Sequence, residues 1–177
     1  MASNNQKKIC LLGVFGVGKT SFVQQFVYNK FSESYLSTIG VKIMKKEMPP
    51  VPDAGGKSVS FDFLIWDIEG VNQSWETPDN YYLGASGALV VADLLRDETV
   101  RDMPKIIERF RKISPQAPIV LAGNKKDLLG ENSKSEKTFT KVVEKENLPG
   151  FFTSAKTNEN VRESFTALAY LIAKNNI

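Results

Sequence analysis

The residues with the clearest chemistry lie in a glycine loop at 13–21, with the sequence Gly-Val-Phe-Gly-Val-Gly-Lys-Thr-Ser. An apolar run at 9–12 precedes it, and apolar side chains at 22, 23, 26 and 27 follow it with helical spacing. A loop between a buried strand and a helix lets several backbone N–H groups face one anion. Lys19 supplies a positive charge for terminal phosphates, and the Thr20 hydroxyl is a hard oxygen suited to Mg²⁺. The alternative is a glycine-rich turn that happens to carry a lysine.

Polar residues follow three further apolar runs, at the points where the predicted strands end. Asp67 and Gly70 follow the run at 59–66, residues 123–127 follow the run at 119–122, and residues 154–156 follow the run at 151–153. Ligands of open α/β sheets bind at the carboxyl ends of the strands, so these segments are expected to meet the glycine loop. An aspartate there can hold Mg²⁺, and a glycine three residues later lets an N–H approach a phosphate. Taken alone, Asp-x-x-Gly is also a common turn.

The segment Asn124-Lys125-Lys126-Asp127 is more specific. The Asp127 carboxylate can accept the two adjacent N–H groups on one edge of guanine, a pair that adenine does not present. Lys125 and Lys156 have alkyl stems long enough to cover the two faces of a flat base. The alternative for this segment is a polar turn that leads into a helix.

The apolar pattern predicts the elements that hold these segments. Strands are expected at 9–12, 39–48, 59–66, 88–92, 119–122 and 151–153, with helices after the glycine loop and around residues 106–113, 139–143 and 161–172. Asp102 is a candidate cap for the second of these helices, with Pro104 near its start. This alternation implies an α/β fold with a mainly parallel sheet. The proline-rich stretch 49–56 is interpreted as a long hairpin tip and a tolerated surface insertion.

Length and composition indicate one globular domain. The chain has 177 residues, 42% hydrophobic and 24% charged, and its polar residues 1–7 are expected to be flexible. A net charge of +3 is too balanced to imply a nucleic-acid partner. The chain has neither a membrane-spanning run nor a secretory signal, so a cytoplasmic location is expected. There is no histidine for catalysis, and Cys10, the single cysteine, lies in an apolar run as a core residue.

With these motifs, the chain resembles the Ras superfamily of small GTPases, most closely the Rab-like branch, from residue 8 to about 174. The resemblance rests on the glycine loop, on residues 35–41, and on the motifs Trp66-Asp67-x-x-Gly70, Asn124-Lys125-x-Asp127 and Ser154-Ala155-Lys156. The approach to the fourth strand at 84–87 and the lack of a lipid-accepting tail are similar to prokaryotic members. The implied fold is a P-loop NTPase G domain, with a six-stranded mostly parallel sheet, one antiparallel edge strand and about five helices.

The resemblance also implies roles for individual residues. Residues 32–40 and 67–82 are expected to be two switch segments that protein effectors and regulators bind, and Lys19, Thr38 and Gly70 are expected to act at the reacting phosphate. Because the chain ends without a cysteine, no direct lipid anchor is expected. Mg²⁺ is expected at Thr20, Thr38 and Asp67, and GTP or GDP at Phe15, Gly16, Val17, Gly18, Lys19, Thr20, Ser21, Phe31, Tyr35, Thr38, Gly70, Asn124, Lys125, Asp127, Ser154, Ala155 and Lys156.

Three residues depart from the family pattern near the expected terminal phosphate. Phe15 stands where relatives have glycine or a small residue, Glu69 replaces the usual alanine, and Val71 replaces the glutamine that orients the attacking water. Two functions are therefore compatible with the sequence: a GTPase switch with slow intrinsic hydrolysis, and an interaction module in which the nucleotide is structural. An ATP-dependent P-loop enzyme is disfavoured by Asp127.

Overall fold

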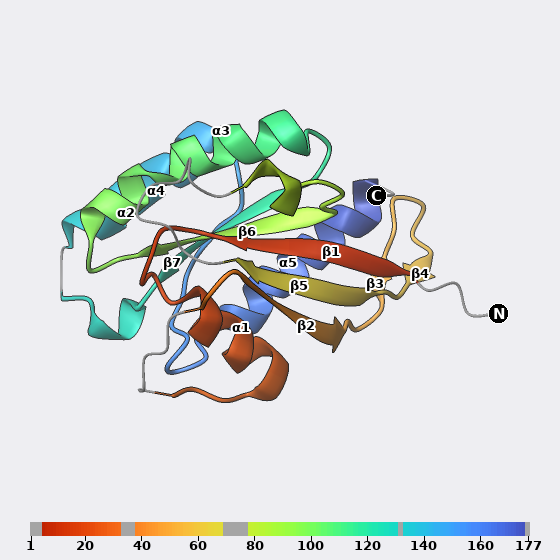
Figure 1. Cartoon of the computed structure of the whole chain (residues 1–177), viewed down its shortest axis with the longest axis horizontal. Coiled ribbons are helices and arrows are strands. Elements are labelled where there is room, and N and C mark those ends of the chain that lie inside the picture. The colour runs from red at the N-terminus through yellow and green to blue at the C-terminus, as the bar shows by residue number, and fades with distance from the viewer. Residues whose placement is uncertain (1–4, 33–37, 69–77, 131–132, 176–177) are drawn as a thin grey trace.

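The computed structural model describes residues 5–32, 38–68, 78–130 and 133–175. Its main sheet is parallel except for β2, which runs antiparallel to β5. The predicted α/β fold with one antiparallel edge strand is confirmed. In spatial order the six strands are β2 (Val41–Glu47), β5 (Asp62–Ile68), β1 (Gln6–Leu12), β6 (Gly87–Asp93), β7 (Ile119–Asn124) and β8 (Gly150–Phe152) (Figure 1).

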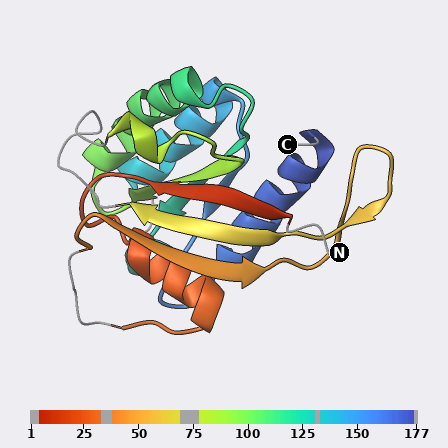
Figure 2. The ribbon, with the colours of Figure 1, turned by 45° about the vertical axis from the view of Figure 1, so that its right-hand side comes forward.

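Five α-helices cover the sheet in the described part of the chain. Helices α1 (Lys19–Tyr28) and α5 (Val161–Asn175) pack together through Phe26 and Phe165, whose stacked rings have centroids 3.8 Å apart. Helices α2 (Asp97–Arg101), α3 (Met103–Ile113) and α4 (Lys134–Glu146) contact one another. In Figure 2, α1 lies below the sheet and α3 lies above it. No helix within the described ranges is long and apolar enough to cross a membrane.

The sequence explains why these elements form where they do. All seven residues of β6 are buried, as expected of a central strand covered on both faces. Helix α3 buries Ile106, Ile107 and Phe110 on one face, and it begins directly after Asp102 with Pro104 in its first turn. The position predicted for the cap is therefore correct, although its carboxylate makes an ion pair with Lys105 rather than a capping hydrogen bond. The short helix α2 was not expected.

The strand boundaries differ from the prediction in informative ways. β1 begins at Gln6 rather than at residue 9, because Gln6 and Lys7 already pair with β5. The segment predicted to be flexible, 1–7, therefore includes two residues of a strand. β5 continues through Ile68 and β7 through Asn124, so Asp67 and Asn124 lie inside strands instead of after them. Asp67 pairs with both neighbouring strands and Asn124 pairs with β6, so the sheet fixes these two polar residues more firmly than a loop would.

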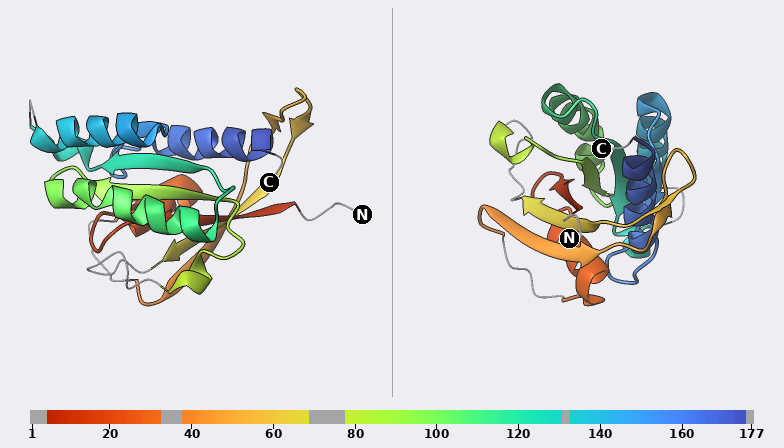
Figure 3. Two further views of the ribbon diagram at one scale, coloured as in Figure 1. Left: turned by 90° about the horizontal axis from the view of Figure 1, so that it is seen from above. Right: turned by 90° about the vertical axis from the view of Figure 1, so that its right-hand side faces the viewer.

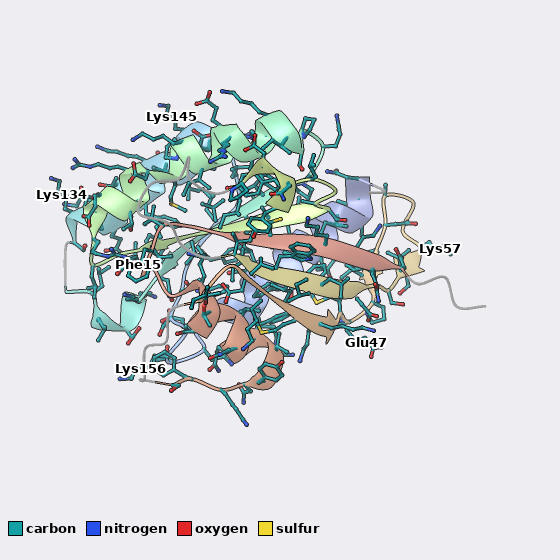
Figure 4. All side chains as sticks on the ribbon, viewed as in Figure 1. Phe15, Glu47, Lys57, Lys134, Lys145 and Lys156 are labelled. Atoms are coloured by element: carbon teal, nitrogen blue, oxygen red, sulfur yellow. The ribbon has the colours of Figure 1, made fainter. Side chains whose placement is uncertain are left out.

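The stretch predicted as one strand at 59–66 is divided, and the hairpin before it is more than a surface loop. Val51–Pro52 (β3) and Ser58–Val59 (β4) form a separate two-stranded sheet, whose turn is held by Asp53 Oδ1 accepting the N–H groups of Gly55 and Lys57, both at 2.9 Å. Val51 is buried, and β3 contacts α5. Both views of Figure 3 place this hairpin beside the C-terminal end of α5, and Figure 4 shows Lys57 far from Phe15.

Candidate functional site

A cavity of about 440 Å³ opens at the carboxyl ends of the strands, at the end of the molecule where Figure 4 labels Phe15 and Lys156. This size suits a small-molecule ligand. Two predicted residues, Val17 and Ser154, do not line the cavity but form hydrogen bonds with the lining residues Asn124 and Asp127. Two others, Tyr35 and Gly70, lie outside the described residues. The predicted site residues that line the cavity are Phe15, Gly16, Gly18, Lys19, Thr20, Ser21, Phe31, Thr38, Asp67, Asn124, Lys125, Asp127, Ala155 and Lys156.

The glycine loop needs its glycines because of close backbone approaches. Gly18 has φ +98°, and a Cβ there would lie 2.5 Å from Asn124 Nδ2. A Cβ on Gly13 would lie 2.3 Å from the carbonyl oxygen of Val91 in β6. The loop ends at the first turn of α1, which has no side-chain cap among the described residues. Its first N–H groups are therefore available to an anion in the cavity.

Lys19 is the buried cation of the loop, with its side chain folded back toward the loop backbone. It is 6% exposed, and its Nζ donates to the carbonyls of Gly13 at 2.7 Å and Val14 at 3.1 Å. Burial lowers the pKa of this ammonium to about 8; the carboxylate of Asp67 opposes that shift and the guanidinium of Arg96 adds to it. An incoming phosphate would relieve the cost of keeping this charge buried.

Side-chain oxygens of three residues, Thr20, Thr38 and Asp67, lie close together next to the glycine loop. The Thr20 hydroxyl donates to Asp67 Oδ2 at 2.6 Å and lies 2.8 Å from the Thr38 hydroxyl. Asp67 is fully buried, and its Oδ1 has no hydrogen-bond partner in the part of the chain that the structure describes. Burial raises the pKa of this carboxyl, and the hydrogen bond from Thr20 and the charge of Lys19 oppose the shift. A buried carboxylate oxygen without a partner needs a cation or a donor.

These residues fit Mg²⁺ because the ion takes hard oxygen ligands and binds through one or two carboxylates together with substrate phosphates. The described residues hold no cluster of three or more histidine, cysteine, aspartate or glutamate side chains that would bind a metal by themselves. The described residues would therefore complete a magnesium site jointly with a phosphate ligand and water.

Asn124 joins the base side of the cavity to the glycine loop. Its Nδ2 donates to the carbonyl of Val17 at 3.0 Å, and its Oδ1 accepts the N–H of Ala155 at 3.1 Å. The residue is 1% exposed, so each of these bonds satisfies a buried polar group. One side chain at the end of β7 thus fixes two loops that are far apart in sequence.

Asp127 is held in place from the segment after β8. It lies in a 3₁₀ turn, η2 (Lys126–Leu128), and its Oδ1 accepts the Ser154 hydroxyl at 2.6 Å. Lys125 directly precedes this turn and has φ +68°. Its Nζ donates to the Gly16 carbonyl at 3.1 Å and pairs with the Asp93 carboxylate at 2.7 Å. Phe31 is 38% exposed at the rim.

Sequence reasoning missed two residues behind the glycine loop. Asp93, the last residue of β6, pairs with both Lys125 and Arg96, and Arg96 donates to the Phe15 carbonyl at 2.8 Å. The signal was present, because Asp93 directly follows a predicted strand at 88–92, as the other site residues follow theirs. Gln24, Ser32, Ile68 and Leu128 also line the cavity without having been predicted.

The comparisons with known proteins agree with this geometry. The Ras family model matches residues 8–174. The chain is 34% identical over 166 residues to Ras-related protein Rab-4B of Homo sapiens, covering 93% of this chain and 75% of the relative. It is 35% identical over 165 residues to GTP-binding protein ypt5 of Schizosaccharomyces pombe (92% and 76%), and 31% identical over 163 residues to GTP-binding nuclear protein GSP1 of Encephalitozoon cuniculi (92% and 74%). The chain therefore belongs to the Ras family and is a Rab-like small GTPase.

Proposed function

We propose that this chain is a guanine-nucleotide switch that binds GTP or GDP together with Mg²⁺ and hydrolyses GTP slowly by itself. The observation that carries the proposal is that one cavity is lined both by Asn124 and Asp127, which can read a base, and by Lys19, Thr20 and Asp67, which can hold phosphates and a metal. The named relatives ypt5 and GSP1 are GTP-binding proteins, which supports the same ligand.

Guanine is selected by the Asp127 carboxylate. Ser154 fixes the orientation of this group, so it presents an acceptor edge to two neighbouring N–H groups. The alkyl stems of Lys125 and Lys156, which both line the cavity, cover the faces of the base. Adenine cannot satisfy this carboxylate, and a site that leaves a charged acceptor unpaired rejects such a ligand.

The phosphates lie against the glycine loop, with Lys19 turning from the Gly13 and Val14 carbonyls toward the outer phosphate oxygens. Thr20 and Thr38 present hydroxyl oxygens to the metal, and Asp67 holds it directly or through water. When bound, Mg²⁺ neutralises charge on the phosphate oxygens. The chain's own part is to hold these oxygen ligands in a fixed position.

Switching depends on segments that contact the terminal phosphate only in the GTP form. Thr38 lies in the first segment, 32–40, within hydrogen-bond distance of Thr20. Gly70 and Tyr35 are proposed to contribute a phosphate-facing N–H and a cover over the phosphates, although both lie outside the described residues. Loss of these contacts on hydrolysis changes the surface that effectors and regulators bind at 32–40 and 67–82.

Slow hydrolysis follows from the residues near the terminal phosphate. The Phe15 ring is 42% exposed and lines the cavity, where it crowds the space for a water or for an arginine from an activating partner. Val71 offers no polar atom to orient water, and Glu69 brings negative charge; both lie outside the described residues. The expected intrinsic rate is no faster than that of Ras, about 3–5 × 10⁻⁴ s⁻¹.

Single-turnover GTP hydrolysis at saturating Mg²⁺ tests this proposal. Phe15→Gly combined with Val71→Gln should raise the rate by more than the two single changes together predict, because both act on one pocket. Tyr170→Ala, which removes an exposed ring on α5, is the control and should leave the rate unchanged. A rate well above that of Ras in the unmodified protein would overturn the slow-hydrolysis claim. Tight GTP and GDP binding with no measurable turnover in any variant would instead favour a nucleotide-bound interaction module.

A further inference from the structure

Three consecutive carbonyls of the glycine loop are each held by a side chain from outside the loop. Arg96 Nη2 donates to Phe15 at 2.8 Å, Lys125 Nζ donates to Gly16 at 3.1 Å, and Asn124 Nδ2 donates to Val17 at 3.0 Å. The second and third of these donors belong to the motif at 124–127, whereas Arg96 belongs to none of the motifs found in the sequence.

These bonds determine which way the loop amides face. A trans peptide is planar, and its C=O and N–H point in opposite directions. Holding the Phe15 carbonyl on the Arg96 side therefore turns the N–H of Gly16 to the opposite side, and the next two bonds do the same for Val17 and Gly18. Gly16, Gly18 and Lys19 line the cavity, whereas Arg96 does not. The held Phe15 carbonyl thus turns the Gly16 N–H toward the place where phosphates bind.

Arg96 is itself fixed by a buried carboxylate. Asp93 is 2% exposed, and its Oδ2 pairs with Arg96 Nε at 3.1 Å and with Lys125 Nζ at 2.7 Å. Its Oδ1 accepts the N–H of Leu95 at 2.9 Å, so its own orientation is fixed from the end of β6. One carboxylate therefore holds two cations, and each cation reaches one carbonyl of the loop. The planar guanidinium can serve Asp93 and Phe15 together because its donors diverge in a fixed geometry.

We propose that Arg96 is a positioning residue for phosphate binding, which fixes the peptide between Phe15 and Gly16 so that its N–H faces the phosphates beyond the first. This inference rests on the proposed function, because it assumes that a guanine nucleotide occupies the cavity. The structure gives this peptide a dedicated support at the residue where the loop carries a phenylalanine instead of a small residue. Arg96 thereby acts on ligand binding without touching the ligand.

The test compares the affinities for GDP and for GMP, measured by competition against a fluorescent GDP analogue in the full chain. Arg96→Ala should reduce the ratio of the two affinities about tenfold, because losing a charge-assisted bond loosens the loop amides that only the second phosphate reaches. Arg96→Lys keeps one charged donor and should give an intermediate ratio. The control is Arg101→Ala, which removes a neighbouring cation that is 58% exposed and pairs with Asp97 in α2.

Each outcome decides a different question. An unchanged ratio in Arg96→Ala overturns the inference, and so does an equal loss for GDP and GMP, which would show a general structural effect. A matching loss in Arg101→Ala would show that any nearby cation has the same effect and would also overturn it. Failure of the unmodified protein to bind GDP would contradict the proposed function itself. Because the Arg96 side chain is 39% exposed, the variants should fold, and their far-ultraviolet circular dichroism should match that of Arg101→Ala.

Discussion

The two ends of the cavity satisfy their polar groups in different ways. At the base end, Asn124 is bonded at both its nitrogen and its oxygen, and the Asp127 carboxylate accepts the Ser154 hydroxyl. At the metal end, Asp67 Oδ1 is buried without a partner among the described residues, and the Thr20 hydroxyl turns to the same carboxylate. At the base end, hydrogen bonds within the protein hold the side chains in place, whereas at the metal end a buried oxygen is left for the ligand to complete.

This difference indicates that one end of the cavity selects the base and the other end responds to the number of phosphates. A base end held by internal hydrogen bonds keeps its shape whichever nucleotide is present, so we expect it to read the base in the same way in every state. A metal end with a buried carboxylate oxygen that lacks a partner among the described residues gains most from its ligand, and a segment that contributes only there, such as 32–40 with Thr38, can change with the ligand. Changes at the base end should therefore alter which nucleotide binds, and changes at the metal end should alter how tightly Mg²⁺ and phosphates are held.

The largest effect is expected from Asp127→Asn. The substitution replaces an acceptor edge by a mixed donor and acceptor edge, and two charge-assisted hydrogen bonds to guanine are lost. The cost is roughly 3–6 kcal/mol of binding free energy, or about 10²–10⁴-fold in affinity. Xanthine carries a carbonyl where guanine has its amino group, so the affinity for xanthosine diphosphate should rise in the same variant. Competition binding with both nucleotides measures this exchange, and unchanged guanine selectivity would refute the role given to Asp127.

Asn124→Ala tests whether the two ends are independent, because this residue joins them. The change leaves the Val17 carbonyl and the Ala155 N–H buried without their partner, which costs about 2–5 kcal/mol of unfolding free energy. It should also weaken phosphate binding by releasing the loop. Asn160→Ala is the control, because it removes a hydrogen bond from a side-chain amide to the Phe152 carbonyl, and neither residue lines the cavity. Denaturant unfolding and GDP titration on both variants check the result; an Asn124→Ala protein with normal GDP affinity would show that the ends are independent.

Thr20→Val sharpens the comparison at the metal end, because valine keeps the shape of threonine and removes the hydroxyl. Nucleotide affinity should fall by about 1.5–3 kcal/mol in Mg²⁺ and should be unaffected when EDTA removes the metal. Thr20→Ser should behave like the unmodified protein. Thr140→Val, which removes an exposed hydroxyl on α4, is a matched control. A loss of equal size with and without Mg²⁺ would assign the hydroxyl a structural role instead.

Much of the fold and most of the candidate site could be predicted from the sequence. The alternating apolar runs predicted the α/β sheet, because strands buried on both faces, such as β6, leave an unmistakable pattern. The motif residues could be placed because parallel strands bring their carboxyl ends to one edge. Asp67 and Asn124 were placed directly after the predicted strands although they belong to β5 and β7, because each strand end was set where the apolar run ended.

Two features that depend on contacts between segments distant in sequence were not predicted. The bond from Arg96 to Phe15 spans 81 positions and carries no periodic signal. The hairpin at 51–59 looked like a surface loop because prolines interrupt it, yet Val51 is buried and the strand contacts α5. Both features depend on which surfaces the fold brings together, and local sequence does not encode that.

The smallest expected effect is a pH dependence of nucleotide binding that arises at Lys19. The pKa of its ammonium is about 8 in the protein without nucleotide, against an ordinary value of 10.5, and phosphates favour the charged form. Binding above pH 8 therefore takes up a proton, and affinity should fall roughly fourfold between pH 7 and 8.5. The unfolded chain binds more protons between these two pKa values, so the free energy of unfolding of the nucleotide-free protein should rise with pH across that window. In Lys19→Arg the guanidinium does not titrate, and both slopes should vanish; GDP titrations and denaturant unfolding at matched ionic strength measure them. A slope that persists in Lys19→Arg would assign the proton to another group in the cavity.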